Sequence, residues 1–165
     1  MKDTSLSPPL EIERKYLIPY PDTAMLEKLP GCVRLDISQT YLKDGAGRAR
    51  KSVSPEGCVY THTVKRRISE LVREETEREI SQEEYLALLR DADPNYRAIT
   101  KTRFRIPYRG HIFEIDIFPF WQDKAVAEVE LSHEDEEIAF PQWLNIINEV
   151  TFDPGYKNTE LARIK

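Results

Sequence analysis

The stretch Glu11-Ile12-Glu13-Arg14-Lys15-Tyr16-Leu17 places charged side chains two residues apart. On a β-strand such side chains point to the same face, so Glu11, Glu13 and Lys15 would line one surface while Ile12 and Tyr16 point to the other. Two adjacent carboxylates repel one another unless a cation lies between them, and a hard divalent cation prefers such a cluster of oxygen atoms. The lysine beside them indicates an anion held next to the metal. The stretch therefore predicts a strand that lines a site for a metal ion and a polyanion.

Length and composition indicate one globular domain. The chain has 165 residues, of which 40% are hydrophobic and 32% are charged, and this is enough for a substantial core. We expect a single domain over residues 1–165, with residues 1–8 as a loose leader. The net charge of −5 argues against indiscriminate nucleic-acid binding, and we expect no specific nucleic-acid partner.

The sequence shows no sign of a membrane segment. No apolar run approaches the roughly 20 residues of a membrane helix. The first nine residues lack the apolar core of a signal peptide. We expect a cytoplasmic protein without a membrane partner.

Strand-like segments separated by turn signals dominate the chain. They lie at residues 10–18, 33–42, 48–53, 59–68, 71–80, 98–108, 111–118 and 125–131. We expect helices at 24–29, at 81–90, at 141–150, where four apolar residues have core-facing spacing, and at 158–164. Eight mostly antiparallel strands with helices packed outside predict an α+β, mainly β fold. Such a sheet forms either an open meander or a closed barrel.

Charge at every second position recurs from strand to strand. The acidic members are Glu11, Glu13, Glu75, Glu77, Glu114, Asp116, Glu128 and Glu130, and the basic members are Lys15, Arg48, Arg50, Lys65, Arg73, Lys101, Arg103 and Arg105. On one strand this pattern is typical of a solvated sheet face. Acidic residues are depleted in strands, however, and here they recur. A closed barrel whose lumen holds metal at the acids and phosphates at the bases accounts for the whole pattern, and eight strands leave room inside for one small ligand.

These strands carry motifs that resemble those of the CYTH superfamily, the triphosphate tunnel metalloenzymes. Glu11-Ile12-Glu13-Arg14-Lys15 resembles the ExExK signature of that superfamily. Further similar motifs follow along nearly the whole chain: Arg48-Ala49-Arg50, Thr63-Val64-Lys65, Arg73-Glu74-Glu75-Thr76-Glu77, Ile99-Thr100-Lys101-Thr102-Arg103-Phe104, Phe113-Glu114-Ile115-Asp116, Ala127-Glu128-Val129-Glu130-Leu131 and Tyr156-Lys157-Asn158. The ordered set is far more specific than ExExK alone. The resemblance implies an eight-stranded antiparallel closed β-barrel, a tunnel that binds a triphosphate with Mg²⁺ or Mn²⁺.

Carried over residue by residue, the resemblance implies roles for particular side chains. The metal ligands would be Glu11, Glu13, Glu128 and Glu130, assisted by Asp116 or Glu77. The phosphate-binding residues would be Lys15, Arg48, Arg50, Lys65, Lys101, Arg103 and Lys157, supported by Arg73, Glu75 and Glu114.

Two candidate catalytic residues follow from the same resemblance. In short bacterial members a tyrosine in a QxYL setting is proposed as the proton acceptor, and Gln39-Thr40-Tyr41-Leu42 matches this setting. Tyr41 is therefore the candidate, and a wall aromatic is its alternative role. Lys101 is a candidate for assistance at the leaving or bridging oxygen, with Lys15 as the alternative.

The favoured activity is hydrolysis of a triphosphate, inorganic tripolyphosphate first, with release of orthophosphate from the terminal phosphoanhydride. One alternative is a class IV-type adenylate cyclase, for which the sequence shows no nucleobase motif, and another is a thiamine triphosphatase on the same fold. A non-catalytic module that binds polyphosphate or nucleotide is a further alternative, but pure anion binding does not need the acidic ligands. The resemblance is also compatible with a homodimer.

Overall fold

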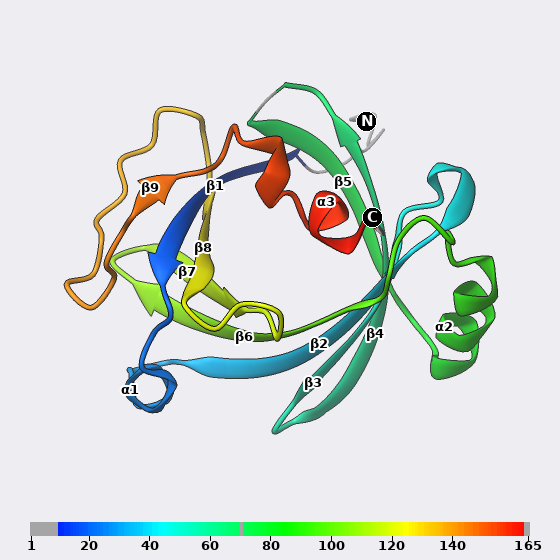
Figure 1. The fold of residues 1–165 in the computed structure, drawn as a ribbon, viewed down its shortest axis with the longest axis horizontal. Coiled ribbons are helices and arrows are strands. Elements are labelled where there is room, and N and C mark those ends of the chain that lie inside the picture. The colour runs from blue at the N-terminus through cyan, green and yellow to red at the C-terminus, as the bar shows by residue number, and fades with distance from the viewer. Residues whose placement is uncertain (1–9, 70, 164–165) are drawn as a thin grey trace, which may run out of the picture.

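The structure, a computed structural model, describes residues 10–69 and 71–163, and the expected leader at residues 1–8 lies outside them. One antiparallel sheet closes on itself (Figure 1). Its strands are β1 (Leu10–Pro19), β2 (Val33–Tyr41), β3 (Arg48–Ser54), β4 (Gly57–Arg67), β5 (Val72–Ile80), β6 (Ile99–Tyr108), β7 (His111–Ile117), β8 (Lys124–Leu131) and β9 (Asn148–Glu149).

The ring is closed by β1, which pairs with a strand on each side. The order of the sheet is β5-β4-β3-β2-β6-β7-β8-β1-β9, and β1 also pairs with β5. Leu10 to Ile12 pair with β5, and Ile12 to Pro19 pair with β8. The predicted closed barrel of eight antiparallel strands is therefore confirmed, with one short extra strand. The ends of the eight predicted strands are displaced by at most two residues.

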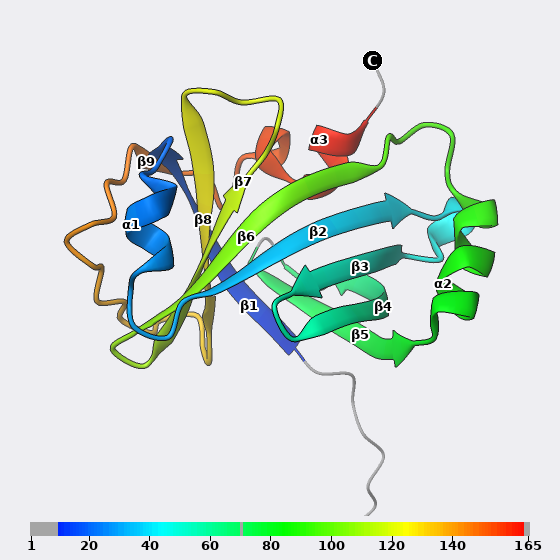
Figure 2. The ribbon, with the colours of Figure 1, turned by 90° about the horizontal axis from the view of Figure 1, so that it is seen from below.

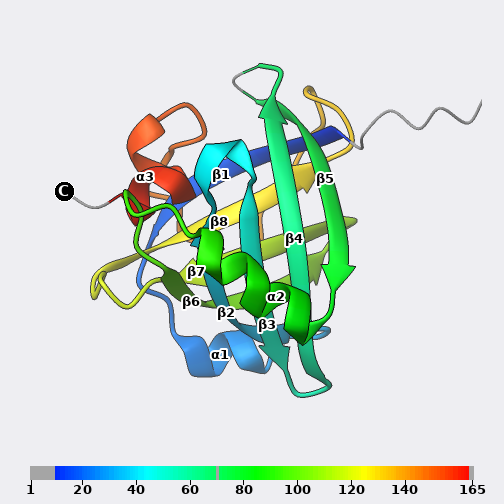
Figure 3. The ribbon, with the colours of Figure 1, turned by 90° about the vertical axis from the view of Figure 1, so that its right-hand side faces the viewer.

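The apolar faces of the strands point outward and are covered. Phe104 and Phe113 are buried on the outer face of β6 and β7, in a cluster that includes Leu26 of α1 (Thr23–Glu27) and Leu144 of the segment before β9. Each such side chain contributes about 1.5–3 kcal/mol when it is fully buried. A second cluster joins Ala49 of β3 to Tyr85 of α2 (Gln82–Leu88). Figures 2 and 3 show both helices outside the wall, with α2 in front of β3 and β4. Burial of the apolar faces outside leaves the charged faces inside.

The helix predicted at 141–150 is wrong. This segment is irregular and ends in β9, which pairs with Tyr16 and Leu17 of β1. Because β5 pairs with β1 only as far as Ile12, the remaining edge of β1 needs other partners. The amides of Ile147 and Val150 supply them, donating to the carbonyls of Leu17 and Lys15 at 2.8 Å. The requirement to satisfy backbone groups outweighs the helical spacing of the apolar residues.

The remaining helices are short. They are the 3₁₀ turns Lys43–Gly45, Leu89–Asp91 and Pro154–Tyr156, and α3 (Asn158–Ala162), which falls within the helix predicted at 158–164. In Figure 1, α3 is seen within the ring of strands, and Figure 2 places it at one end of the barrel. Leu161 and Ala162 hold it there, in a cluster with Phe118 of the β7–β8 connection. None of the helices in the described part of the chain is long and apolar enough to span a membrane.

Candidate functional site in the barrel lumen

Two adjoining cavities occupy the lumen. Their volumes are about 490 Å³ and 220 Å³, and both are lined by Glu13, Arg48, Lys65 and Asn158. We call the larger cavity the acidic chamber, because its carboxylates outnumber its cations. The carboxylates are Glu11, Glu13, Glu75, Glu77, Glu114, Glu128 and Glu130, and the cations are Arg48, Arg50, Lys65, Arg103 and Arg105.

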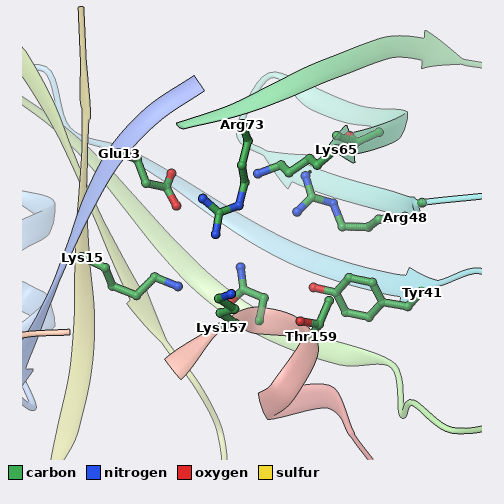
Figure 4. Close-up of a pocket in the computed structure, with 11 residues that line it drawn as sticks. Glu13, Lys15, Tyr41, Arg48, Lys65, Arg73, Lys157 and Thr159 are labelled. Carbon is green, nitrogen blue, oxygen red and sulfur yellow. Dashed lines mark hydrogen bonds between the residues drawn. The ribbon is translucent and has the colours of Figure 1, made fainter. Parts of the chain in front are cut away.

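We call the smaller cavity the basic chamber. Figure 4 shows side chains from β1, β2, β3, β4, β5 and the segment around α3 converging on it. Its cations are Lys15, Arg48, Lys65, Arg73 and Lys157, and Glu13 is its one carboxylate among the described residues. The carboxylates therefore gather in the acidic chamber, whereas cations line both chambers.

Carboxylates face one another across the strands of the acidic chamber. Glu13 is the register partner of Glu130, and Glu114 is the partner of Glu128. Like charges directly opposite one another destabilise a sheet. Burial raises the pKa of Glu13 to about 8, and Glu128 and Glu11 add to the rise. A divalent cation between these oxygens would remove the repulsion, so the donor set fits Mg²⁺ or Mn²⁺.

Lysines hold two of these carboxylates. Lys65 Nζ donates to Glu11 Oε1 at 2.9 Å, and Lys15 Nζ lies 3.4 Å from Glu128 Oε1. In this arrangement, no three Asp, Glu, His or Cys side chains in residues 10–69 and 71–163 converge as a ready-made metal site. A metal ion would therefore bind best together with an anion that draws the lysines away from the carboxylates.

Lys15 and Lys65 have carboxylate partners, whereas the other cations of the basic chamber have none among the described residues. Arg48 is buried, and its Nε has no hydrogen-bond partner among the described residues. Burial, together with Arg67, Arg73 and Lys15, lowers the pKa of Lys157. Cations that gather without matching carboxylates form a site for a polyanion.

Gly47 brings Arg48 into this position. Its φ of +89° lies in the region that favours glycine, and a Cβ added there would come within 2.1 Å of the Thr63 carbonyl oxygen. The close approach lets β3 begin against β4, so that Arg48 and Thr63 become register partners. The Arg48 side chain then reaches Thr63 Oγ1 at 3.5 Å on the inner face of the wall.

Every predicted site residue except Lys101 and Asp116 lines one of the two chambers. These two side chains are buried in the wall beside Arg103. Asp116 accepts hydrogen bonds from Lys101 at 2.7 Å and from Arg103 at 2.7 and 2.8 Å. Burial alone would raise the pKa of Asp116, but Arg103 and Lys101 hold it well below its usual range. With both oxygens engaged, Asp116 is less suited to bind a metal than the four glutamates, and it fixes Arg103 in place.

Tyr41 lines the basic chamber, and Gln39 lies behind it. Burial raises the pKa of Tyr41, although Arg48, Arg50 and Lys15 oppose the rise. Gln39 was not among the predicted site residues, although it is the first residue of the QxYL setting and shares the inner face of β2 with Tyr41. Asn158 and Thr159 also line the basic chamber; Asn158 belongs to the Tyr156-Lys157-Asn158 motif but was not predicted as a site residue, and Thr159 carried no signal in the sequence.

The barrel and its lining define the class of protein: a closed antiparallel barrel that encloses a lumen lined by carboxylates and cations. No protein-family model matches the chain, and no curated protein matches it by sequence. A solved structure described as the inorganic triphosphatase NE1496 is 29% identical, with a TM-score of 0.54, over 92% of this chain and 93% of that one. A second structure of NE1496, described as a hypothetical protein, is 28% identical, with a TM-score of 0.56, over 92% and 97% of the two chains.

A more distant likeness is to HpAC1 from Hippeastrum, described as a putative adenylyl cyclase with a dominant triphosphatase activity. It is 18% identical, with a TM-score of 0.47, over 74% of this chain and 80% of the other, which is too weak to carry an argument. The likeness to NE1496 spans nearly the whole of both chains. The chain is a CYTH-fold protein.

Proposed function

We propose that the protein is a metal-dependent hydrolase of triphosphates and that inorganic tripolyphosphate is its preferred substrate. The observation that carries this proposal is the distribution of charge in the lumen, where a chamber lined by both carboxylates and cations adjoins one lined mainly by cations. A metal ion and a linear polyanion together match this arrangement, and neither does so alone. The likeness to the inorganic triphosphatase NE1496 supports the same reaction class.

Binding exchanges partners inside the lumen. The phosphates take over Lys65 and Lys15, which now hold Glu11 and Glu128, while Arg48 offers its unpartnered Nε. The remaining phosphate contacts come from Arg50, Arg73, Arg103 and Lys157. These forked and point-like donors fix the chain of phosphates and offset the negative charge that spreads over the transferred group.

The carboxylates released from the lysines would hold the metal. Glu11, Glu13, Glu128 and Glu130 form the ligand set, and Glu77, which accepts a hydrogen bond from Thr63 at 2.7 Å, lies close to it in the acidic chamber. When bound, Mg²⁺ or Mn²⁺ neutralises phosphate charge and makes a bound water more acidic. Lys101 contributes by holding Asp116, and through it Arg103, in the wall.

The lining of the chambers favours an inorganic substrate. Among the described residues, Tyr41 is the one aromatic side chain that lines either chamber. A nucleobase is usually held by stacking on aromatic rings or in an apolar slot. Charged groups line the lumen instead, as a substrate made entirely of phosphate requires.

The test is release of orthophosphate from tripolyphosphate, with Mg²⁺ and with Mn²⁺. Glu13→Ala should lower the rate by about a hundredfold or more, because it removes a carboxylate from the centre of the ligand set. Glu74→Ala, on the outer face of β5 where Glu74 pairs with Arg66 at 2.8 Å, is the matched control and should keep its activity. Normal turnover by Glu13→Ala, or turnover in a chelator, would refute the proposal.

Product analysis with ATP separates the reaction types. A hydrolase gives ADP and orthophosphate, whereas a cyclase gives cyclic AMP and pyrophosphate. Tight binding of tripolyphosphate without turnover, with metal in excess, would instead assign the lumen to a binding module.

A further inference from the structure

The side chain of Gln39 links the two chambers through the wall. It is fully buried, at 0% exposure. Its Oε1 accepts hydrogen bonds from Arg50 Nε at 3.1 Å and Arg50 Nη2 at 2.7 Å, and its Nε2 donates to the Tyr41 hydroxyl at 3.2 Å. Arg50 lines the acidic chamber and Tyr41 the basic one. A buried amide thus connects a cation of one chamber to a phenol of the other.

The direction of these hydrogen bonds is fixed by chemistry. A guanidinium can only donate, so the oxygen of the Gln39 amide must face Arg50. The NH₂ group must then face Tyr41, and the phenol oxygen must accept. The register of the sheet supports this orientation, because Gln39 and Arg50 are direct cross-strand partners on β2 and β3.

An accepting phenol oxygen leaves the hydroxyl proton free for another partner. The charged groups that act on Tyr41 are Arg48, Arg50 and Lys15, all of them cations without acceptor atoms, and Arg48 also donates a hydrogen bond to the phenol oxygen. Within the described part of the chain, no residue accepts a hydrogen bond from this hydroxyl. The nearest place for an acceptor is the basic chamber, which Tyr41 lines.

We propose that Gln39 is a positioning residue: held by Arg50, it donates to the Tyr41 oxygen and so directs the Tyr41 hydroxyl proton at an anionic oxygen of the bound triphosphate. This inference rests on the proposed function, because it needs a triphosphate in the lumen. It makes Tyr41 a hydrogen-bond donor to the substrate, in place of the proton acceptor that the resemblance implied. The raised pKa of Tyr41 agrees with this role, since the phenol keeps its proton at neutral pH.

The decisive variant is Gln39→Glu, which preserves the shape but reverses one hydrogen bond. The new carboxylate still accepts from Arg50, but it cannot donate, so the Tyr41 hydroxyl turns its proton toward the carboxylate and away from the substrate. We expect kcat for tripolyphosphate to fall by about tenfold or more. KM should rise as well, because the added negative charge offsets the positive charge of Arg50, which is a predicted phosphate contact.

A double-mutant cycle with Tyr41→Phe isolates the positioning role. In the Tyr41→Phe background, Gln39→Glu should still raise KM, but it should lower kcat no further, because there is no hydroxyl left to turn. A merely structural glutamine would lower kcat by the same factor in both backgrounds, and that result would overturn the proposal. Ser38→Glu places the same charge on the opposite face of β2 and should leave kcat unchanged.

One further variant and one spectroscopic measurement test the proposal independently of Gln39→Glu turnover. Gln39→Leu, which neither accepts nor donates, should show the same dependence on Tyr41 if Gln39→Glu fails to fold. The second measurement uses 3-fluorotyrosine at position 41, observed by ¹⁹F NMR, and does not need turnover. Addition of tripolyphosphate should shift the signal in the wild type and shift it less in Gln39→Glu.

The two proposals fail in different ways. An enzyme that releases no phosphate but shifts the ¹⁹F signal on binding tripolyphosphate would refute the hydrolase and leave the role of Gln39 standing. An active enzyme whose ¹⁹F signal does not respond to tripolyphosphate would refute the positioning role alone.

Discussion

Glu13 illustrates the repulsion between carboxylates in the lumen. It lies opposite Glu130, with Glu11 and Glu128 close by, and burial together with these neighbours raises its pKa to about 8. In the unfolded chain a glutamate has a pKa of about 4.3. Between these two values the folded protein holds a proton that the unfolded chain has released.

The sign of the effect on stability follows from this difference. The contribution of protonated Glu13 is fully present below the unfolded pKa and is lost as the pH rises through the folded pKa of about 8. In a metal-free buffer with a chelator, the wild type should therefore lose stability relative to Glu13→Gln as the pH increases from about 5 to about 8. Urea unfolding of both proteins across this range measures the difference, and parallel curves would contradict the raised pKa.

At the scale of the element, the β6–β7 hairpin has one suited and one unsuited residue in its turn. Tyr108 and His111 are register partners, so Arg109 and Gly110 form a two-residue loop, and both have positive φ, +44° and +81°. Such loops favour Asn-Gly, because asparagine tolerates this conformation better than arginine does. Nothing lies within 4 Å of a Cβ added at Gly110, so the conformation alone decides the effect of a substitution there.

Substitutions at the two turn positions should therefore change stability in opposite directions. Arg109→Asn should increase the free energy of unfolding by up to about 1 kcal/mol, whereas Gly110→Ala should decrease it by about 1–2 kcal/mol. Denaturant midpoints at equal m-values measure both changes. A loss of stability in Arg109→Asn would mean that the stacking of Arg109 on Tyr108, at 5.4 Å from the ring centroid, outweighs the backbone term.

The strands could be predicted from sequence because they obey a local rule. Charged and apolar residues alternate along them, and this alternation indicates that the apolar face packs in the core. The segment 141–150 could not be predicted in this way. Its conformation depends on the unpaired edge of β1, which exists only once β5 has stopped pairing at Ile12. Its apolar spacing indicated a helix, but in the structure Ile147 is 55% exposed.

The lining of the lumen was also predictable, but its internal pairing was not. Inward-facing charges follow from the period of two, and fourteen of the sixteen charged residues in that pattern line the chambers. Whether Lys65 meets Glu11 depends on closure of the barrel, which brings β4 and β1 to either side of β5. Whether Lys101 and Arg103 meet Asp116 depends on the exact register of the β6–β7 hairpin. Gln39 was missed for the same reason, because only the pairing of β2 with β3 brings Arg50 to its oxygen.

For the whole molecule, the proposed function implies that metal and anion would compete with the protein's own ion pairs. Lys65 holds Glu11 at 2.9 Å and lies 3.8 Å from Glu75. A metal ion that binds alone must displace this lysine, and a polyanion that binds alone leaves the carboxylates repelling one another. On this proposal each ligand would prepare the lumen for the other, which is positive coupling between two adjoining sites.

Lys65→Met should strengthen the stabilising effect of the metal added alone and weaken that of the anion added alone. Without the lysine, Glu11 and Glu75 are free, so Mg²⁺ alone should raise the thermal midpoint of Lys65→Met more than that of the wild type. A non-hydrolysable imido analogue of tripolyphosphate, added without metal, should raise it less, because one phosphate contact is gone. Ligand at a hundred times its Kd stabilises a protein by about 2.7 kcal/mol, which is well above the resolution of a thermal scan. Arg66→Met, on the outer face of β4 where Arg66 pairs with Glu74, should respond to both ligands as the wild type does. Equal responses of the wild type and Lys65→Met to Mg²⁺ would show that the lysine does not compete with the metal, and the exchange of partners would then have to be abandoned.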